Sequence, residues 1–419
     1  MATQAKHATF EGWRVVSAAF VLAVFGWGLG FYGPPVFLKV LHESRGWPIA
    51  LIATAVTVHF LVGAYSGANM AALHRRFGAA KVTRACSISM AGGLIIWATS
   101  REPWHMFVAS LLSGAGWGGM SAAALNAIVS PWFVRKRPSA LGMAYNGGSI
   151  GGVIFSPLWV ATIAGLGFAD AAMAIAATMI LGLWVLAGRY FSRTPERMGL
   201  APDGDAPGDP PSSITSVHAR PLPGRLLWLD RRFVTLSAAM AFGLFAQIGL
   251  IAHLYSLLAP ALGAQMAGFA MALITAMAIA GRTLLGWTMP IGADRRLVAC
   301  AGYAAQLLGS VMFYLAAGES IALLLAGVIL FGLGFGNATS LPPLIAQVEF
   351  VKDDVTRAVA LVVGIGQATY AFAPATFGLI REFAPQLDAA PPGAAPYVFA
   401  TAALIQGVAI VSFLTGRRW

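Results

Sequence analysis

One charged side chain stands out within a long apolar stretch of this sequence. Arg282 lies in the run Ala276–Leu284, in which every other residue is uncharged. If this run crosses a membrane, such a charge is costly and is usually kept for a function. A guanidinium offers a fixed fork of hydrogen-bond donors that matches a carboxylate. Arg282 is therefore a candidate ligand for an organic anion, and the alternative is a structural arginine bound by carbonyl groups or a helix end.

Two histidines, His59 and His253, also lie in apolar runs. Histidine changes charge near neutral pH, so His59 is a candidate for coupling to a proton. The alternative for both residues is a neutral ring that shares a hydrogen bond with another helix. His253 is close to the end of its run, where the lipid headgroups would lie.

Neutral polar and aromatic side chains in the apolar runs could complete a binding site. Hydroxyl and amide groups donate to a carboxylate, and aromatic rings shape a cavity. The alternative for each is a contact between helices, worth about 0.6 kcal/mol on average. In addition to Arg282, the substrate-binding candidates are Trp27, Tyr32, Asn146, Asn337, Gln367 and Tyr370.

The sequence shows no set of residues for enzymatic chemistry. It contains no intramembrane carboxylate pair, no histidine cluster with metal-ligand spacing and no Ser-His-Asp set. The glycine runs at 114–119 and 147–152 follow no strand and precede no lysine at Walker spacing, so they indicate close helix packing rather than nucleotide binding. We expect no catalytic residue, no metal and no cofactor.

The composition requires elements that lie in a membrane. Of the 419 residues, 58% are hydrophobic and only 10% are charged, which is too little charge to cover a soluble protein of this size. The many aromatic and aliphatic residues exclude disorder, and the glycines have no G-X-Y period, which excludes collagen. At about 20 residues for each span, twelve helices fit into this length.

The apolar residues form twelve runs, six before a polar stretch at 192–232 and six after it. Within this stretch, residues 202–211 are rich in Pro, Gly and Asp, which is typical of a disordered or loosely held linker. The sequence predicts an all-α membrane protein with a six-helix bundle at 1–191, a cytoplasmic linker at 192–232 and a second bundle at 233–419. The expected spans are Val15–Leu38, Ile49–Ala72, Val82–Thr99, Met106–Val129, Ser139–Leu166, Ala171–Phe191, Phe233–Leu258, Met266–Pro290, Leu297–Ala317, Ile321–Val348, Ala358–Ile380 and Tyr397–Leu414.

The net charge of +11 follows from topology. With both termini in the cytosol, 22 of the 27 Lys and Arg residues fall on the cytosolic side and only four on the other. This bias obeys the positive-inside rule, and it would disappear if one helix were miscounted. We expect a multi-pass protein of the inner (plasma) membrane with both termini in the cytoplasm. The partners expected are the lipid bilayer and a small molecule, with no nucleic acid, and the protein is expected to be a monomer.

The two halves resemble each other in their loops and glycine runs. Loop residues after the second span are repeated 219 positions later, after the eighth span. The run Gly114–Gly118 of the fourth span likewise recurs at Gly332–Gly336 in the tenth, offset by 218. Such a repeat is typical of transporters whose halves alternate around a central site. The loop motifs, expected to act in conformational change, contain Gly67, Arg76 and Gly78 in the first half and Gly286, Asp294 and Arg295 in the second.

Three motifs carry a resemblance to a known family. They are Gly33–Lys39 followed by Arg45–Pro48, Trp132–Phe133 with Arg137 and Ala140–Gly142, and Gly147–Gly152. Over nearly its whole length the chain resembles the major facilitator superfamily, and within it the branch of monocarboxylate transporters and oxalate/formate antiporters. The resemblance implies the major facilitator fold, with two six-helix bundles related by an internal repeat. It also implies a substrate arginine in the eighth helix, which matches Arg282.

The sequence departs from this resemblance at three positions. Proton-coupled members have an acidic residue one turn before the arginine, where this chain has Ala278. The oxalate/formate antiporters have a lysine in the eleventh helix, which is absent from 362–370. The first loop motif normally has an acidic residue where this chain has Arg75. A single fixed cation suits a monoanion, because a second buried negative charge would be unpaired.

Three functions are compatible with these features. The favoured one is a secondary active transporter that moves a small organic anion, a monocarboxylate, by alternating access as an antiporter or a symporter. The second is efflux of amphipathic compounds on the same fold. The third, a membrane sensor or a membrane-embedded enzyme, ranks lowest, because neither an added soluble domain nor a catalytic set is evident.

Overall fold

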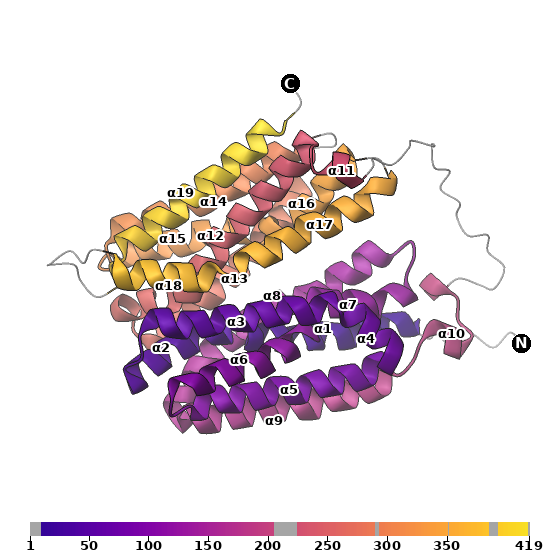
Figure 1. Cartoon of the computed structure of the whole chain (residues 1–419), viewed down its shortest axis with the longest axis horizontal. Helices are drawn as coiled ribbons and strands as arrows, with labels where there is room; N and C mark the ends of the chain where they lie inside the picture. Colours follow the sequence, from indigo (N-terminus) through magenta and orange to yellow (C-terminus); the bar gives the residue numbers. More distant parts are fainter. Residues whose placement is uncertain (1–9, 205–223, 290–292, 351, 385–392, 418–419) are drawn as a thin grey trace, which may run out of the picture. The chain divides into compact units, whose positions relative to one another are not determined.

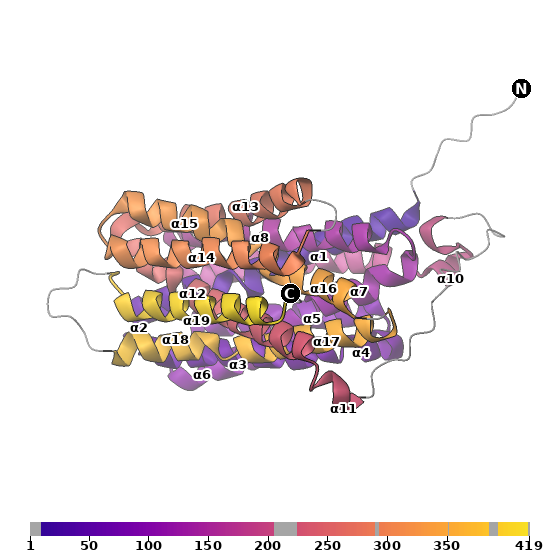
Figure 2. The same ribbon diagram turned by 90° about the horizontal axis from the view of Figure 1, so that it is seen from above.

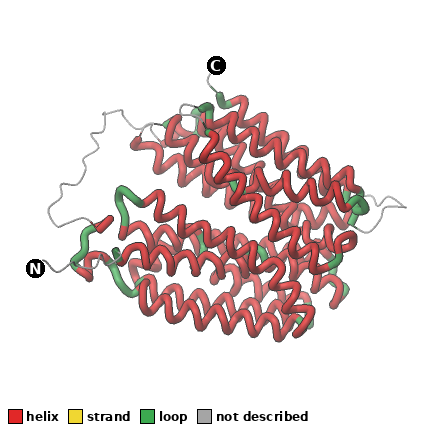
Figure 3. The backbone as a smooth tube through the Cα atoms, turned by 180° about the vertical axis from the view of Figure 1, so that it is seen from behind, coloured by secondary structure: helices red, strands yellow, loops and turns green. Residues whose placement is uncertain are grey.

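The computed structural model describes residues 10–204, 224–289, 293–350, 352–384 and 393–417 (Figure 1). In these residues every regular element is helical, as Figure 3 shows. Twelve helical segments are long and apolar enough to cross a membrane, which confirms the predicted all-α fold with twelve spans. The fifth span has the predicted bounds Ser139–Leu166, whereas the first is longer than predicted at Glu11–Arg45, because the helix continues beyond the apolar run.

The described helices group into two compact units. Unit 1 is Met1–Tyr32, Val62–Gly152 and Leu166–Ile214, and unit 2 is Gly33–Leu61, Val153–Gly165 and Thr215–Trp419. Parts of the first, second and fifth spans therefore pack with the second-half helices in unit 2. The bundles at 1–191 and 233–419 and the linker at 192–232 describe the order along the chain, and they stay a prediction.

Unit 1 contains most of the first six spans. Helix α5 packs against α6 and α9, and α1 packs against α7 and α9. The elements are α1 (Glu11–Gly30), the end of α3 (Ile49–Ala68), α4 (Met70–Phe77), α5 (Ala79–Thr99), α6 (Pro103–Gly118), α7 (Ala122–Val129), η1 (Ser130–Trp132), the first part of α8 (Arg137–Leu166), α9 (Phe168–Leu186), the π-helical η2 (Ala187–Phe191), α10 (Pro195–Met198) and η3 (Pro202–Gly204).

Unit 2 is built around α12, which contacts α2, α13, α17, α18 and α19. Helix α14 lies beside α15 and α19 (Figure 2). Besides the parts of α3 and α8 named above, the elements are α2 (Gly33–Arg45), α11 (Gly224–Leu227), α12 (Arg231–Leu262), α13 (Ala264–Thr288), α14 (Arg295–Ala316), α15 (Ile321–Phe335), α16 (Asn337–Glu349), α17 (Lys352–Tyr370), α18 (Ala373–Phe383) and α19 (Pro396–Thr415).

Capping side chains fix the starts of three spans in unit 2. Asp230 accepts a hydrogen bond from the backbone N–H of Arg232 at 2.8 Å, before α12. Asp294 and Ser320 accept similar bonds before α14 and α15. These side chains satisfy N–H groups that have no partner within their own helix. Each of these helices thus begins where a polar residue meets the apolar run.

Within the described residues, four spans are interrupted between two helices. The breaks separate α1 from α2, α6 from α7, α15 from α16, and α17 from α18. The breaks in the fourth and tenth spans each follow a glycine run, at Gly118 and Gly336, so the repeat seen in the sequence extends to this feature. Interrupted helices expose backbone groups at membrane depth, which is tolerated only where protein or a cavity provides partners.

The glycine run at 147–152 packs α8 closely on α1 within unit 1. A Cβ atom at Gly147 would lie 2.2 Å from the carbonyl oxygen of Phe20, and one at Gly151 would lie 2.4 Å from that of Val24. Only glycine allows this approach. The expectation that this run serves helix packing is therefore confirmed.

Candidate functional site

Arg282 lies on α13 against the break in the tenth span. Its Nε atom donates to the carbonyl oxygen of Gly336 at 3.3 Å, between α15 and α16. The residue lies about 9 Å before the end of α13 at Thr288, so it is closer to this end than the expected mid-span position. Gly336, however, is near the middle of the span Ile321–Glu349. The contact therefore holds the Nε atom of the guanidinium near the middle of the neighbouring span.

The two helices approach closely beside this contact. A Cβ atom at Gly281 would lie only 2.1 Å from the carbonyl oxygen of Leu333. A Cβ atom at Gly336 would lie 2.2 Å from the carbonyl oxygen of Ala278. The position of Arg282 is thus fixed by close backbone packing in the turn of α13 that precedes it.

Asn337 is brought to the same break as Arg282. It is the first residue of α16, directly after Gly336, and only 6% of its surface is exposed. Its side-chain Oδ1 has no hydrogen-bond partner among the described residues. A buried amide oxygen without a partner is costly, so Asn337 is suited to bind a donor at this position.

A second group in unit 2 joins the second and eleventh spans. The ring of Phe60 on α3 lies 6.1 Å from the ring of Tyr370 at the end of α17, edge to face. The ring of His59, which is 2% exposed, lies 5.3 Å from that of Phe60. Gln367 is half-buried nearly one turn before Tyr370, and its carbonyl oxygen accepts from the N–H of Ala371. Phe60 could not be predicted from the sequence, because phenylalanine is common in membrane spans.

The remaining substrate-binding candidates lie in unit 1. The half-buried Trp27 ring packs edge to face on Trp117 at 5.0 Å. Tyr32, 4% exposed, lies in the break between α1 and α2, and its N–H donates to the carbonyl oxygen of Trp27 at 2.9 Å. Asn146 is exposed on α8, next to the closely packed Gly147. Trp117 could not be predicted as a partner of Trp27, because it lies inside a glycine run whose expected role is close helix packing.

His253 has the structural role that the sequence left open. It is fully buried on α12, and its Nε2 lies 2.9 Å from the carbonyl oxygen of Pro374 on α18. Nε2 must carry a proton to bond a carbonyl oxygen. In this structure His253 therefore forms a hydrogen bond to another helix, which is the alternative to proton coupling that the sequence had left open.

The loop motif of the second half forms a network at the start of α14. Asp294 accepts from the N–H of Arg296 at 2.9 Å and from Nε of Arg417 at 2.7 Å. Burial alone would raise the pKa of the Asp294 carboxyl, but the bonds from Arg417 and from the backbone hold this pKa below its usual value. Arg295 donates to the carbonyl oxygen of Leu344 on α16. Gly286 lies in α13, before this loop.

The first-half copy of the motif differs. Gly78 has φ 83° and separates α4 from α5, a conformation that suits glycine. Arg76 is exposed and lies over the ring of Phe77 at 5.1 Å. Gly67 is buried, with Ser121 3.2 Å from a Cβ built there. Near this loop, burial lowers the pKa of His74 to about 4, so its ring is neutral at physiological pH.

Arg296, which the sequence placed among the cytosolic loop charges, is a buried hydrogen-bond centre. Only 2% of it is exposed, and helix α14 begins at Arg295, two residues earlier than predicted. Its side chain donates to Glu349 Oε1 at 2.6 Å, Glu349 Oε2 at 2.7 Å, the Arg232 carbonyl at 2.9 Å, Thr235 Oγ1 at 3.0 Å and the Phe413 carbonyl at 3.3 Å. This network ties α12, α14, α16 and α19 at one end of unit 2.

Part of the expected disordered linker is held in place. Asp203 in η3 is 6% exposed and accepts three backbone N–H groups, from Val134 at 3.0 Å, Arg135 at 2.8 Å and Lys136 at 3.1 Å. The expectation of a loose segment is therefore wrong for Pro202–Gly204, because a carboxylate binds amides that precede α8. Residues 205–223 lie outside the described part of the chain. Burial raises the pKa of Asp203, but the three backbone bonds outweigh this and lower it.

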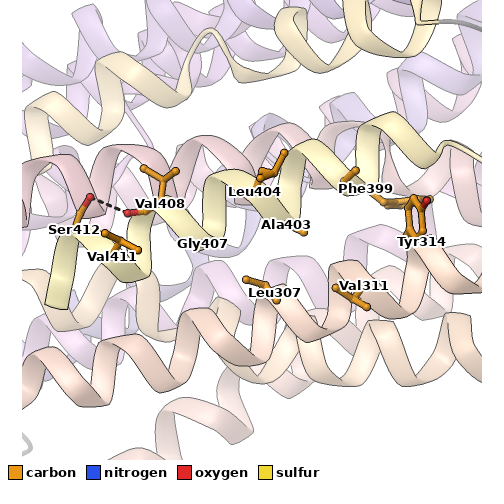
Figure 4. A pocket seen from close by; sticks show the side chains of 11 residues that line it. Leu307, Val311, Tyr314, Phe399, Ala403, Leu404, Gly407, Val408, Val411 and Ser412 are labelled. Carbon is orange, nitrogen blue, oxygen red and sulfur yellow. Dashed lines mark hydrogen bonds between the residues drawn. The ribbon is translucent and has the colours of Figure 1, made fainter. Parts of the chain in front are cut away.

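A large groove in unit 2 is separate from these residues. It has a volume of about 700 Å³ and lies between α14 and α19, lined by apolar side chains such as Leu307, Leu404 and Val411 (Figure 4). It has no charged side chain and none of the candidate residues. Its polar side chains are those of Tyr314 and Ser412, and no cation there would neutralise an anion. Among the described residues, no group of three His, Cys, Asp or Glu could hold a metal ion.

The chain is similar to known transporters over most of its length. The family model described as Major Facilitator Superfamily matches residues 16–374. The MFS-type transporter 1 of Ophiocordyceps sp. (strain BCC 1869) is 25% identical over 353 residues, 82% of this chain and 73% of that protein. Monocarboxylate transporter 13 of Bos taurus is 27% identical over 150 residues, and monocarboxylate transporter 11 of Mus musculus is 28% identical over 153 residues. Each of these two matches covers 35% of this chain and only 34% or 32% of the relative.

Solved structures share the fold at low identity. The nucleoside transporter NupG aligns with a TM-score of 0.70 and 14% identity, over 98% of this chain and 100% of that one. A bacterial homolog of the human lysosomal transporter Spinster, in an inward-facing and occupied conformation, aligns with a TM-score of 0.69 and 13% identity, over 96% and 95% of the two chains. At these identities the likeness shows the fold.

Proposed function

Since this chain belongs to the Major Facilitator Superfamily of membrane transporters, we propose that it moves a small organic anion, a monocarboxylate, with Arg282 as the ligand of the carboxylate. One observation carries the proposal. The base of the Arg282 guanidinium is held against Gly336, in the break at the middle of the tenth span. A cation with forked donors at this depth is the feature that an organic anion requires.

Three further features support a monoanion. Asn337 brings a buried amide to the same break, next to the carbonyl that Arg282 contacts, and the NH2 group of an amide is a donor for a carboxylate. A single guanidinium neutralises one negative charge, and a second buried negative charge would need another cation. Two of the similar proteins are named monocarboxylate transporters, which favours the same class of substrate.

We place the protein in the inner (plasma) membrane as a monomer, with both termini in the cytoplasm. The distribution of Lys and Arg along the sequence favours this orientation over its reverse. Transport would occur by alternating access of two bundles, which is the plan of transporters with internal repeats. His59 is the candidate for proton coupling, since it is buried in α3 and its ring contacts that of Phe60, which in turn contacts the ring of Tyr370. We propose no enzymatic activity.

The test measures binding and transport with purified protein. Acetate, lactate, pyruvate and benzoate are compared with succinate and uridine by thermal shift, for the wild type, Arg282→Ala and Arg282→Lys. A ligand at ten times its Kd stabilises the folded protein by about 1.4 kcal/mol. We expect a monocarboxylate to stabilise the wild type and to lose this effect in Arg282→Ala, with partial retention in Arg282→Lys because the charge remains without the fork.

The matched control is Arg101→Ala, which removes the same charge from an exposed loop residue. This variant should respond to the ligand as the wild type does. Uptake of the stabilising monocarboxylate into proteoliposomes should fall at least tenfold in Arg282→Ala only. Equal uptake by Arg282→Ala and the wild type would refute the proposal and favour export of amphipathic compounds, which does not require this charge.

A further inference from the structure

Helix α18 is a separate half of the eleventh span. Helix α17 ends at Tyr370 and α18 begins at Ala373, with a turn at Ala371 and Phe372 between them (Figure 1). Pro374 lies in the first turn of α18 and cannot donate a backbone hydrogen bond. The residue before α18, Phe372, gives no side-chain cap. The first turn of α18 therefore needs its partners from other helices.

The helices α3 and α18 cap each other. Thr57 of α3 accepts the backbone N–H of Ala375 in the first turn of α18 through its Oγ1, at 3.1 Å. Glu382 of α18 accepts the backbone N–H of Ala50 in the first turn of α3 through its Oε2, at 2.7 Å. The two bonds are about 10 Å apart along each helix, so the helices run antiparallel. Each helix satisfies an N–H group that the other leaves without an internal partner.

Between these two bonds the helices approach closely. A Cβ atom at Gly378 would lie 2.7 Å from the Cβ of Ala53 and 3.2 Å from the Cα of Ala50. The contact is a small-residue seam with a hydrogen bond at each end. Such a seam has few rotatable side chains to rearrange, so it forms or separates as a whole.

The opposite face of α18 is tied to α12. His253 of α12 contacts the carbonyl oxygen of Pro374 through Nε2 at 2.9 Å. Arg381 donates to the Oγ of Ser256, which in turn donates to the carbonyl oxygen of His253 at 2.7 Å. Phe377 is fully buried and lies 2.4 Å from a Cβ built at Gly249 of α12. The eleven residues of α18 are thus held on two faces by side chains, and joined to α17 by a short turn.

We propose that α18 is a gate: a half-helix that pivots at Ala371–Phe372 and releases α3, with Thr57 and Glu382 as the positioning residues that hold it closed. The inference rests on the proposed transport function, since a gate needs a path to close. Tyr370 and Gln367 lie directly before the pivot, so a substrate at these candidates would bias the position of α18. With the termini in the cytoplasm, the gate lies at the non-cytoplasmic end.

The test is hydrogen–deuterium exchange of the full-length protein in lipid nanodiscs, without any substrate, so that its outcome is independent of what the protein carries. Thr57→Val removes the hydroxyl at nearly constant shape, Thr57→Ser restores it, and Glu382→Met removes the carboxylate. In the wild type we expect the amides of α18 and of the first turn of α3 to exchange at a common rate, faster than those of α17. Thr57→Val should raise this rate about fivefold and Glu382→Met at least tenfold, because the second bond has a charged acceptor.

Glu319→Gln is the matched control, because it removes a carboxylate from an exposed residue after α14 that has no hydrogen bond to α3. It should leave exchange in α18 unchanged, and Thr57→Ser should exchange as the wild type does. A rise confined to α18 and the first turn of α3 supports the gate. No rise in either variant, or a rise that extends equally through α17 and α12, would overturn it, because α18 would then not move as a unit.

Discussion

The buried pair of Arg296 and Glu349 gives the sharpest stability prediction. Arg296 is 2% exposed and Glu349 19%, and two parallel hydrogen bonds of 2.6 and 2.7 Å join them. Removing one partner of a buried pair costs about 3–5 kcal/mol, because the other charge stays buried without compensation. Since Glu349 keeps some access to solvent, we expect about 3 kcal/mol for Arg296→Ala. With an unfolding entropy of about 2.1 cal/mol/K for each residue, a chain of 419 residues loses roughly 1 °C for each kcal/mol, so we expect Tm to fall by about 3 °C.

The adjacent arginine is a matched control. Arg295→Ala removes the same charge one residue away, but it breaks only the bond to the carbonyl oxygen of Leu344. One hydrogen bond is worth about 1 kcal/mol, or roughly 1 °C. Thermal unfolding of both variants and the wild type is followed by intrinsic tryptophan fluorescence in the same detergent. The comparison separates the effect of the network from the effect of net charge.

A double variant completes this experiment. Arg296→Met with Glu349→Met removes both charges, and replacing a buried pair by apolar groups of similar volume is often neutral. We expect it to recover about half of the loss, since the carbonyls of Arg232 and Phe413 still lose their donor. If Arg296→Ala and Arg295→Ala lose the same Tm, or if the double variant is the least stable, the pair is not the centre of this end of unit 2.

Two further predictions concern other contacts. Asp203→Asn keeps a side chain that tolerates the φ of 63°, but it loses the charged acceptor of three N–H groups. It should therefore destabilise unit 1 by about 2 kcal/mol at pH 7. The control, Asp170→Asn on the exposed start of α9, should not destabilise it. Because the pKa of Asp203 is lowered in the folded protein, its contribution to the stability of the fold is full at neutral pH and is lost as the pH falls below about 4. The difference in Tm between the wild type and Asp203→Asn should therefore disappear in acid. An equal difference at pH 3 would contradict this account. Gly281→Ala should cost about 2 kcal/mol and reduce transport, because the new Cβ would lie 2.1 Å from the carbonyl oxygen of Leu333 and push Arg282 away from Gly336. Gly364→Ala is the control, because a Cβ there would have nothing within 4 Å, and it should be neutral or stabilising in the same unfolding assay.

The spans could be predicted from the sequence because lipid leaves few alternatives. A backbone in hydrocarbon must satisfy its hydrogen bonds internally, so each long apolar run becomes a helix. The start of α14 was predicted within two residues, since Asp294 marks the change from polar to apolar. The breaks inside spans were not predicted, because glycine both allows close packing and ends helices, and the runs ending at Gly118 and Gly336 do both.

The contacts of charged residues could not be predicted from their place along the chain. Arg295 and Arg296 are neighbours in the chain, yet Arg296 is nearly fully buried and Arg295 is half-buried. The reason is that successive side chains on a helix point in different directions. Asp203 lies in a stretch whose composition favours disorder, and only the free amides of 134–136 give it partners. In both cases the deciding partner is more than 50 residues away in the sequence.

Several candidate residues lie at interrupted spans, and this placement gives each of them backbone groups as neighbours. Tyr32 lies in the break between α1 and α2, Asn337 directly after the one between α15 and α16, and Tyr370 directly before the one between α17 and α18. Arg282 lies on an unbroken helix but contacts Gly336 in a break. A continuous helix offers a substrate only side chains, whereas an interrupted one also offers backbone N–H and carbonyl groups that otherwise stay unpaired in the membrane. Variants that restore a continuous helix at these positions should therefore impair binding even where no candidate side chain changes.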